Sequence, residues 1–127
     1  MSLGQALPTL ERVIEQEDIA SYAEASGDFN PLHLDTTFAA STPFGGTIVH
    51  GMHQFALINE LLTAAFGEQW PATGRLKVRF RAPARPGDRL RVSAAVTKAE
   101  DHEVSLAIEL SNQSGELLIS GDARVAL

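Results

Sequence analysis

Residues 51–66 read Gly-Met-His-Gln-Phe-Ala-Leu-Ile-Asn-Glu-Leu-Leu-Thr-Ala-Ala-Phe, a stretch in which apolar residues recur at helical spacing. Apolar side chains cover most of the circumference of such a helix, so we expect the rest of the fold to enclose it largely. The segment therefore predicts a long apolar helix at the centre of the molecule.

The segments on either side of this helix predict helices first and strands afterwards. Upstream, we expect a short strand over Leu10–Gln16, a helix over Glu17–Ala25 that Gly27 ends, and one or two helical turns over Asp35–Ser41, with Asp35 as N-cap and Phe38 facing inward. Thr42–Gly46 predicts a turn and Glu68–Gly74 a loop, and the strands that follow are expected over residues 76–80, 90–97, 103–111 and 116–126. Helices followed by antiparallel strands indicate one α+β domain over residues 1–127, with a sheet wrapped around the central helix.

The composition is that of an ordinary globular protein. The chain has 127 residues, of which 44% are hydrophobic and 20% charged. It has no cysteine, which excludes disulfides, thiolate metal sites and a cysteine nucleophile. We find no signal-peptide pattern and no segment apolar enough to cross a bilayer, so we expect a cytoplasmic protein that does not contact membranes.

The net charge of −6 is unevenly distributed. Seven of the ten basic residues lie in one window, namely Arg75, Lys77, Arg79, Arg81, Arg85, Arg89 and Arg91. Only Asp88 opposes them there, so the window carries about +6 and the remainder about −12. This balance does not favour nucleic-acid binding. The strip instead suits one anionic group, such as the phosphates of a cofactor-linked substrate, although arginines on the exposed face of a half-buried sheet are an equal alternative.

A second distinctive stretch, residues 26–35, reads Ser-Gly-Asp-Phe-Asn-Pro-Leu-His-Leu-Asp. It places Asp28 and His33 five positions apart, separated by Asn30 and Pro31. Proline has no N–H and pushes the preceding residue out of the helical region, so we expect Asp28 and His33 on an irregular loop. A carboxylate and an imidazole that exchange protons near neutral pH suit hydration or dehydration chemistry.

The pattern Tyr22-x3-Ser26-Gly27-Asp28-x-Asn30-Pro31-Leu32-His33-x-Asp35 is followed by Phe38-Ala39, Phe44-Gly45 and Ile48-Val49-His50-Gly51-Met52. In these motifs the chain resembles the MaoC-like (R)-specific enoyl-CoA hydratases, which are hot-dog-fold enzymes. The matching motifs span residues 22–52, and the expected order of elements extends the resemblance over nearly the whole chain.

The resemblance implies reversible hydration of a trans-2-enoyl thioester to the (R)-3-hydroxyacyl thioester. Asp28 and His33 would hold and activate the water, and the backbone N–H of Gly51 would polarise the thioester carbonyl. In one sequence of events Asp28 takes a proton as water attacks C3 and His33 delivers the proton to C2, but which residue is base and which is acid stays open. A free N–H at a helix start independently suits a developing oxyanion.

We further expect substrate contacts from Asn30, Phe44, His50, Asn59 and Arg79. Asn30 is also expected to organise the loop. Asn59 falls on an apolar stripe of the central helix, so its amide needs a partner, which is either loop backbone or the substrate pocket. Arg79 belongs to the basic strip, which would meet the phosphates of coenzyme A or of a phosphopantetheinyl carrier protein; the sequence does not choose between them.

The expected reaction requires no metal ion and no redox cofactor, and coenzyme A or phosphopantetheine enters only as part of the substrate. His33, His50 and His53 lack a further acid or cysteine at a recognisable ligand spacing, so we predict no metal site. The resemblance implies a homodimer with an acyl tunnel near its interface. Two alternatives remain: a thioesterase on the same fold, and a non-catalytic subunit of a heteromeric dehydratase.

Overall fold

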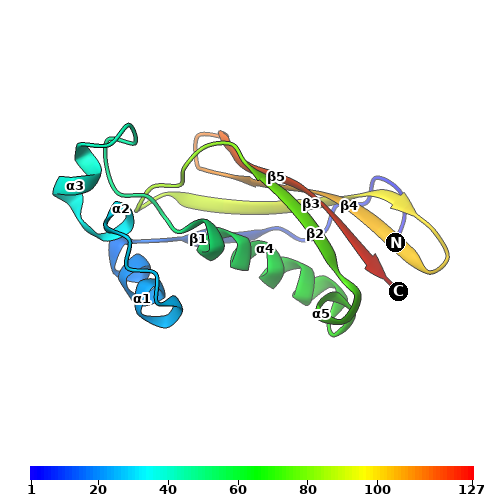
Figure 1. Cartoon of the computed structure of the whole chain (residues 1–127). Coiled ribbons are helices and arrows are strands. Elements are labelled where there is room, and N and C mark those ends of the chain that lie inside the picture. Colours follow the sequence, from blue (N-terminus) through cyan, green and yellow to red (C-terminus); the bar gives the residue numbers. More distant parts are fainter.

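A computed structural model describes all residues 1–127, and a single sheet and one long helix dominate it (Figure 1). In chain order the elements are β1 (Leu10–Val13), α1 (Gln16–Ser26), α2 (Pro31–Leu34), α3 (Thr36–Ala40), α4 (Gly51–Phe66), α5 (Gln69–Thr73), β2 (Arg75–Phe80), β3 (Arg89–Ala99), β4 (Glu103–Ser111) and β5 (Leu117–Ala126). The predicted α+β order is confirmed, and the central helix has the predicted bounds.

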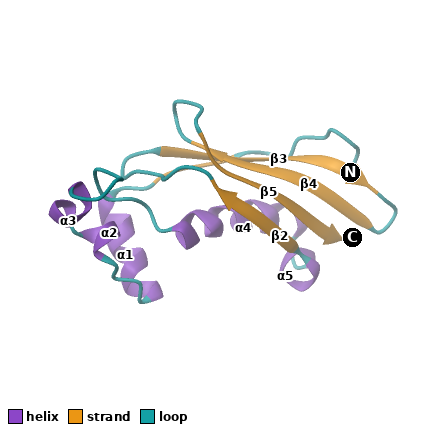
Figure 2. Ribbon diagram, turned by 45° about the horizontal axis from the view of Figure 1, so that its top comes forward, coloured by secondary structure: helices purple, strands orange, loops and turns teal.

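The five strands form one antiparallel sheet in the order β1-β3-β4-β5-β2. Side chains alternate along the strands, so that Leu90, Val92 and Val96 of β3 and Leu106 and Ile108 of β4 are buried on one face. The sheet arches over α4, with α1, α2 and α3 gathered near the start of α4 and α5 at its far end (Figures 1 and 2). This is the predicted hot-dog arrangement.

Helix α4 is enclosed on one side only, in contrast to the sequence expectation. Ile58, Leu61 and Leu62 are buried against the sheet, whereas Met52 on the opposite side is 61% exposed. The apolar circumference of the helix therefore exceeds the area that this single sheet covers. None of the helices is both long and apolar enough to span a membrane.

Two local predictions are wrong. The expected loop over Glu68–Gly74 contains the short helix α5, because Pro71 lies in its first turn, where a missing N–H breaks no helical hydrogen bond. Phe38 is 45% exposed, and the neighbouring Ala39 is the buried residue of α3. The predicted cap is confirmed, since the Asp35 carboxylate accepts a hydrogen bond from the Phe38 N–H at 3.0 Å.

Gly121 in β5 lies opposite Val78 in β2, and the two strands approach closely there. A Cβ at position 121 would lie 2.6 Å from the Lys77 carbonyl oxygen and 2.9 Å from Val78 Cγ1. We predict that Gly121→Ala forces β2 away from β5 and lowers the free energy of unfolding by about 1–3 kcal/mol, measured by urea denaturation.

Gly46→Ala is the matched control, because a Cβ there would meet only Arg85 Nη1 at 3.6 Å, an ordinary contact. Equal stabilities of the two variants would show that the close approach at Gly121 is unimportant.

Candidate active site

The carboxylate of Asp28 lies just beyond the end of α1. Gly27 takes a left-handed conformation (φ 76°), and its N–H bonds to the Ala23 carbonyl, which ends the helix. Local hydrogen bonds then shape the loop: the Asp28 N–H donates to Ser26 Oγ at 3.2 Å, and the Asn30 N–H donates to Asp28 Oδ1 at 3.2 Å. The side chain of Asp28 is thereby presented to solvent at the mouth of the site.

His33 lies on the short helix α2, not on an irregular loop as predicted. Asn30 is indeed non-helical (φ −54°, ψ 127°), but Pro31 occupies the first position of α2, where proline is favourable. The Asn30 side chain caps this helix by accepting a hydrogen bond from the Leu32 N–H at 3.0 Å, the predicted loop-organising role. The proline therefore starts a helical turn and fixes the direction of His33.

A hydrogen bond to one backbone carbonyl holds the His33 ring in one tautomer. His33 is 9% exposed, and its Nδ1 lies 2.8 Å from the Ile48 carbonyl oxygen. A carbonyl oxygen only accepts, so Nδ1 carries the proton and Nε2 presents a lone pair. Gln16 supports the same turn, because its Nε2 donates to the His33 carbonyl at 2.7 Å and its Oε1 accepts from Thr47.

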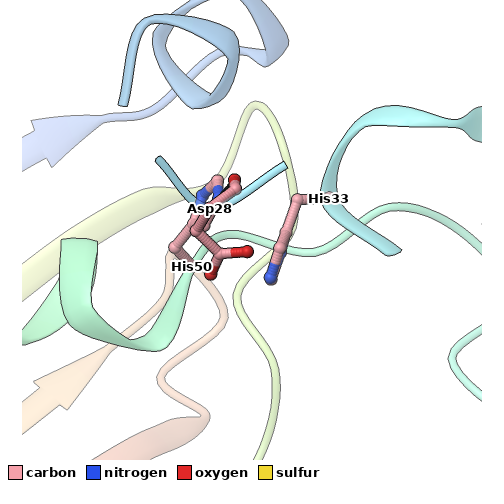
Figure 3. Close-up of side chains that lie close together, drawn as sticks. All are labelled: Asp28, His33 and His50. Carbon is pink, nitrogen blue, oxygen red and sulfur yellow. Dashed lines mark hydrogen bonds between the residues drawn. The ribbon is translucent and has the colours of Figure 1, made fainter. Parts of the chain in front are cut away.

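Asp28 and His33 converge with a third residue, His50 (Figure 3). A carboxylate oxygen of Asp28 and one ring nitrogen from each histidine all lie within 4.8 Å of one another. One water that hydrogen-bonds two groups bridges a separation of about 4.5 Å. The carboxylate and the imidazole can therefore hold a single water between them.

A cavity of roughly 290 Å³ opens beside this pair. Its lining includes His33, Phe44, Gly51, Gln54, Phe80 and Arg81. Gly51 is the first residue of α4, so its N–H has no carbonyl partner in the helix and lies at the positive end of the helix dipole. The site thus combines a carboxylate and an imidazole close enough to share a water, a free N–H donor and a largely apolar chamber.

Four aromatic rings form a contiguous row beside Asp28, in which two of the three ring contacts are stacked and one is tilted by 54°. The His33 and His50 rings stack with centroids 3.9 Å apart, Tyr22 packs against His50 at 4.8 Å, and His53 stacks on Tyr22 at 4.6 Å. Burial, reinforced by the nearby His50, holds the pKa of His53 below its usual value, while Asp18 opposes the shift.

Comparisons with known proteins agree with this geometry. The MaoC-like domain model matches residues 2–116. The chain belongs to the MaoC-like dehydratase family. It is 35% identical to an (R)-specific enoyl-CoA hydratase of Aeromonas caviae, covering 87% of this chain and 84% of that protein. It is 36% identical to a 3-hydroxybutyryl-CoA dehydratase of Methylorubrum extorquens, covering 91% of this chain and 74% of that protein. An unliganded R-hydratase from Pseudomonas aeruginosa superposes with a TM-score of 0.85 at 31% identity, and the match covers 98% of this chain and 81% of that chain.

Of the other predicted substrate contacts, this MaoC-like chain places Phe44 on the cavity and Asn59 and Arg79 away from it. The Asn59 side chain donates to the Phe55 carbonyl at 3.0 Å and accepts from Trp70 Nε1 at 2.8 Å, so its amide has structural partners. Arg79 lies in a shallow hollow on the outer face of the sheet.

Sequence reasoning missed Gln54 and included Arg81 only as a member of the basic strip, and both residues line the cavity. Gln54 is 3% exposed, and its Oε1 has no hydrogen-bond partner. The signal was available, since Gln54 follows Gly51 by three positions and so shares its face of α4. Arg81 follows the last residue of β2, where it lines both the cavity and the outer hollow.

The converging residues of this MaoC-like site also bear on metal binding. Two histidines and an aspartate are a set that zinc accepts. The converging residues are Asp28, His33 and His50, so Asp28 replaces His53 in the three-residue set considered from the sequence. The His33 and His50 rings, however, are only 22° from parallel, so their in-plane lone pairs do not meet at one point. The geometry suits a shared water better than a metal ion.

The lowered pKa of His53 predicts a pH dependence of stability. The unfolded chain protonates this residue near pH 6.5, before the folded protein does, so the free energy of unfolding falls as pH drops from about 6.5 toward the lower folded pKa. We expect His53→Gln to reduce this loss, measured by urea denaturation at pH 7.5 and 5.5.

His102→Gln, at an exposed turn, is the control and should keep the wild-type loss. An undiminished loss in His53→Gln would contradict the prediction.

Proposed function

We propose that this protein reversibly hydrates trans-2-enoyl-CoA thioesters to (R)-3-hydroxyacyl-CoA thioesters. The observation that carries the proposal is the convergence of the Asp28 carboxylate and a His33 ring nitrogen within 4.8 Å, beside the cavity that Gly51 lines. The (R)-specific enoyl-CoA hydratase and the 3-hydroxybutyryl-CoA dehydratase to which the chain is similar support the substrate class.

The tautomer of His33 supports one assignment of roles to the two side chains. With Nδ1–H bonded to the Ile48 carbonyl, Nε2 is free to accept a proton from the bridging water. Asp28 accepts a hydrogen bond from the other O–H of that water, which stays intact, and stabilises the imidazolium that forms. The water oxygen adds to C3 and the imidazolium returns its proton to C2, so H and OH are added across the double bond without any redox change.

The N–H of Gly51 contributes at the other end of the reacting group. As water adds to C3, negative charge develops on the thioester oxygen, and a helix-start N–H beside a mostly apolar chamber stabilises it. The Phe80 ring lies only 3.3 Å from where a Cβ at position 51 would be, so glycine leaves this N–H accessible without moving Phe80.

Arg81 offers a route from the reacting centre to the phosphates of coenzyme A. It lines both the cavity and the outer hollow, whose lining also includes Lys77 and Arg79. None of these three cations forms an ion pair within the chain. Unpaired cations that continue outward from the cavity support a phosphate-bearing substrate.

A second copy of the chain would complete the chamber. Met52, Phe29 and Phe80 near the site are all more than half exposed, an unusual clustering of large apolar side chains. We therefore propose a homodimer that covers the open side of α4.

Asp28→Asn and His33→Ala test the function in an assay of crotonyl-CoA hydration followed by loss of enoyl absorbance. Each change should lower kcat by at least ~100-fold, because Asp28→Asn removes the negative charge beside the bridging water and His33→Ala removes its proton acceptor. Circular dichroism should show an unchanged fold.

Asp101→Asn and His102→Ala are matched controls, since both residues are exposed on the turn between β3 and β4. Wild-type rates in Asp28→Asn or His33→Ala would remove the role assigned to that residue. Thiol release from a saturated acyl-CoA, without hydration, would identify a thioesterase instead.

A further inference from the structure

His50 is a buried polar residue that the proposed chemistry does not use. It is 1% exposed and immediately precedes α4, where its carbonyl accepts hydrogen bonds from the His53 and Gln54 N–H groups at 3.1 and 3.2 Å. Its ring lies behind Asp28 and beside His33 (Figure 3). A polar ring buried at this depth requires a hydrogen-bond partner.

That partner is the main chain of the loop that carries Asp28. His50 Nε2 lies 3.0 Å from the Asp28 carbonyl oxygen, so Nε2 carries the ring proton and donates. Nδ1 of His50 is buried and has no partner. The ring is therefore held through a single directed hydrogen bond.

This bond is the one long-range hydrogen bond of the loop formed by residues 27–30. The other hydrogen bonds of residues 27–30 join groups two to four positions apart, such as Asp28 N–H to Ser26 Oγ and Asn30 N–H to Asp28 Oδ1. The bond from His50 spans 22 positions. Local bonds fix the shape of the loop, and the bond from His50 ties the loop directly to the start of α4.

His50 also contacts the second reactive group. Its ring stacks on the His33 ring with centroids 3.9 Å apart. The Tyr22 ring packs against the His50 ring, with centroids 4.8 Å apart. One rigid ring thus touches the backbone of Asp28 and the imidazole of His33, and it projects from the residue next to Gly51. A displacement of this ring would alter the spacing of the water-holding pair.

We propose that His50 is a positioning residue that sets the separation between Asp28 and His33. The inference rests on the proposed hydration and replaces the expected substrate contact of His50 with an indirect role. A loop shift of about 1 Å is sufficient to reduce turnover on the order of 100-fold, because the water must stay within reach of both groups.

His50→Phe keeps an aromatic ring but removes the donor, whereas His50→Gln keeps a donor but removes the stack. In crotonyl-CoA hydration we expect His50→Phe to lower kcat by about 10- to 100-fold with KM changed less than about threefold, and His50→Gln to recover part of the loss. His102→Phe, at an exposed turn, controls for the substitution itself. Wild-type kcat in folded His50→Phe, or equal losses in both variants, would overturn the proposal.

The tautomer of His50 provides a second measurement on the wild-type protein, which is needed if the variants fail to fold. Long-range ¹⁵N–¹H NMR spectra should show Nε2 protonated and Nδ1 bare, and an Nδ1–H tautomer would overturn the proposal. A wild-type protein that hydrates no enoyl-CoA would refute the proposed function, while the tautomer would still decide whether His50 anchors the loop.

Discussion

Burial of one face of α4 beneath the sheet is the contact on which the rest of the structure depends. Ile58 and Leu62 have no exposed surface, and they fix the axis of the helix within the hydrophobic core beneath the sheet. Once the axis is set, the start of the helix is set as well, and with it the N–H of Gly51 and the ring of His50. The hydrogen bond from Trp70 to Asn59 secures the region where the chain turns back into the sheet. Hydrophobic packing therefore determines where the polar chemistry takes place.

The polar site is built from main-chain acceptors as much as from reactive side chains. His33 donates to the Ile48 carbonyl and His50 donates to the Asp28 carbonyl, so each ring has a defined tautomer before any ligand is present. The two carbonyls belong to different loops, since Asp28 precedes α2 in the chain and Ile48 lies between α3 and α4. Such fixed donors and acceptors need little rearrangement during reaction, which is the general source of catalytic electrostatic stabilisation.

The sequence predicts the architecture and the candidate residues that converge at the site, because both are encoded locally. Helical and alternating spacing give the element order, and the Asp28–His33 and His50–Gly51 motifs lie within short segments. One failure is local, and the others reflect tertiary contact. Helix α5 was expected to be a loop because Pro71 was interpreted as a breaker, and the partner of Asn59 proved to be Trp70, eleven positions away. The bond from His50 to Asp28 spans 22 positions and leaves no periodic signal.

The hydrogen bond from His50 to residue 28 involves only the peptide carbonyl of that residue, and this has an evolutionary consequence. Any amino acid provides the same oxygen, so the hydrogen bond from His50 does not depend on the side chain at position 28, and asparagine there would also keep an oxygen to accept the bond from the Asn30 N–H. A duplicated gene could lose the carboxylate by a single codon change and still encode a protein with the same surface and chamber. Inactive paralogues that serve as scaffolds for an active sibling are thus readily accessible from this architecture.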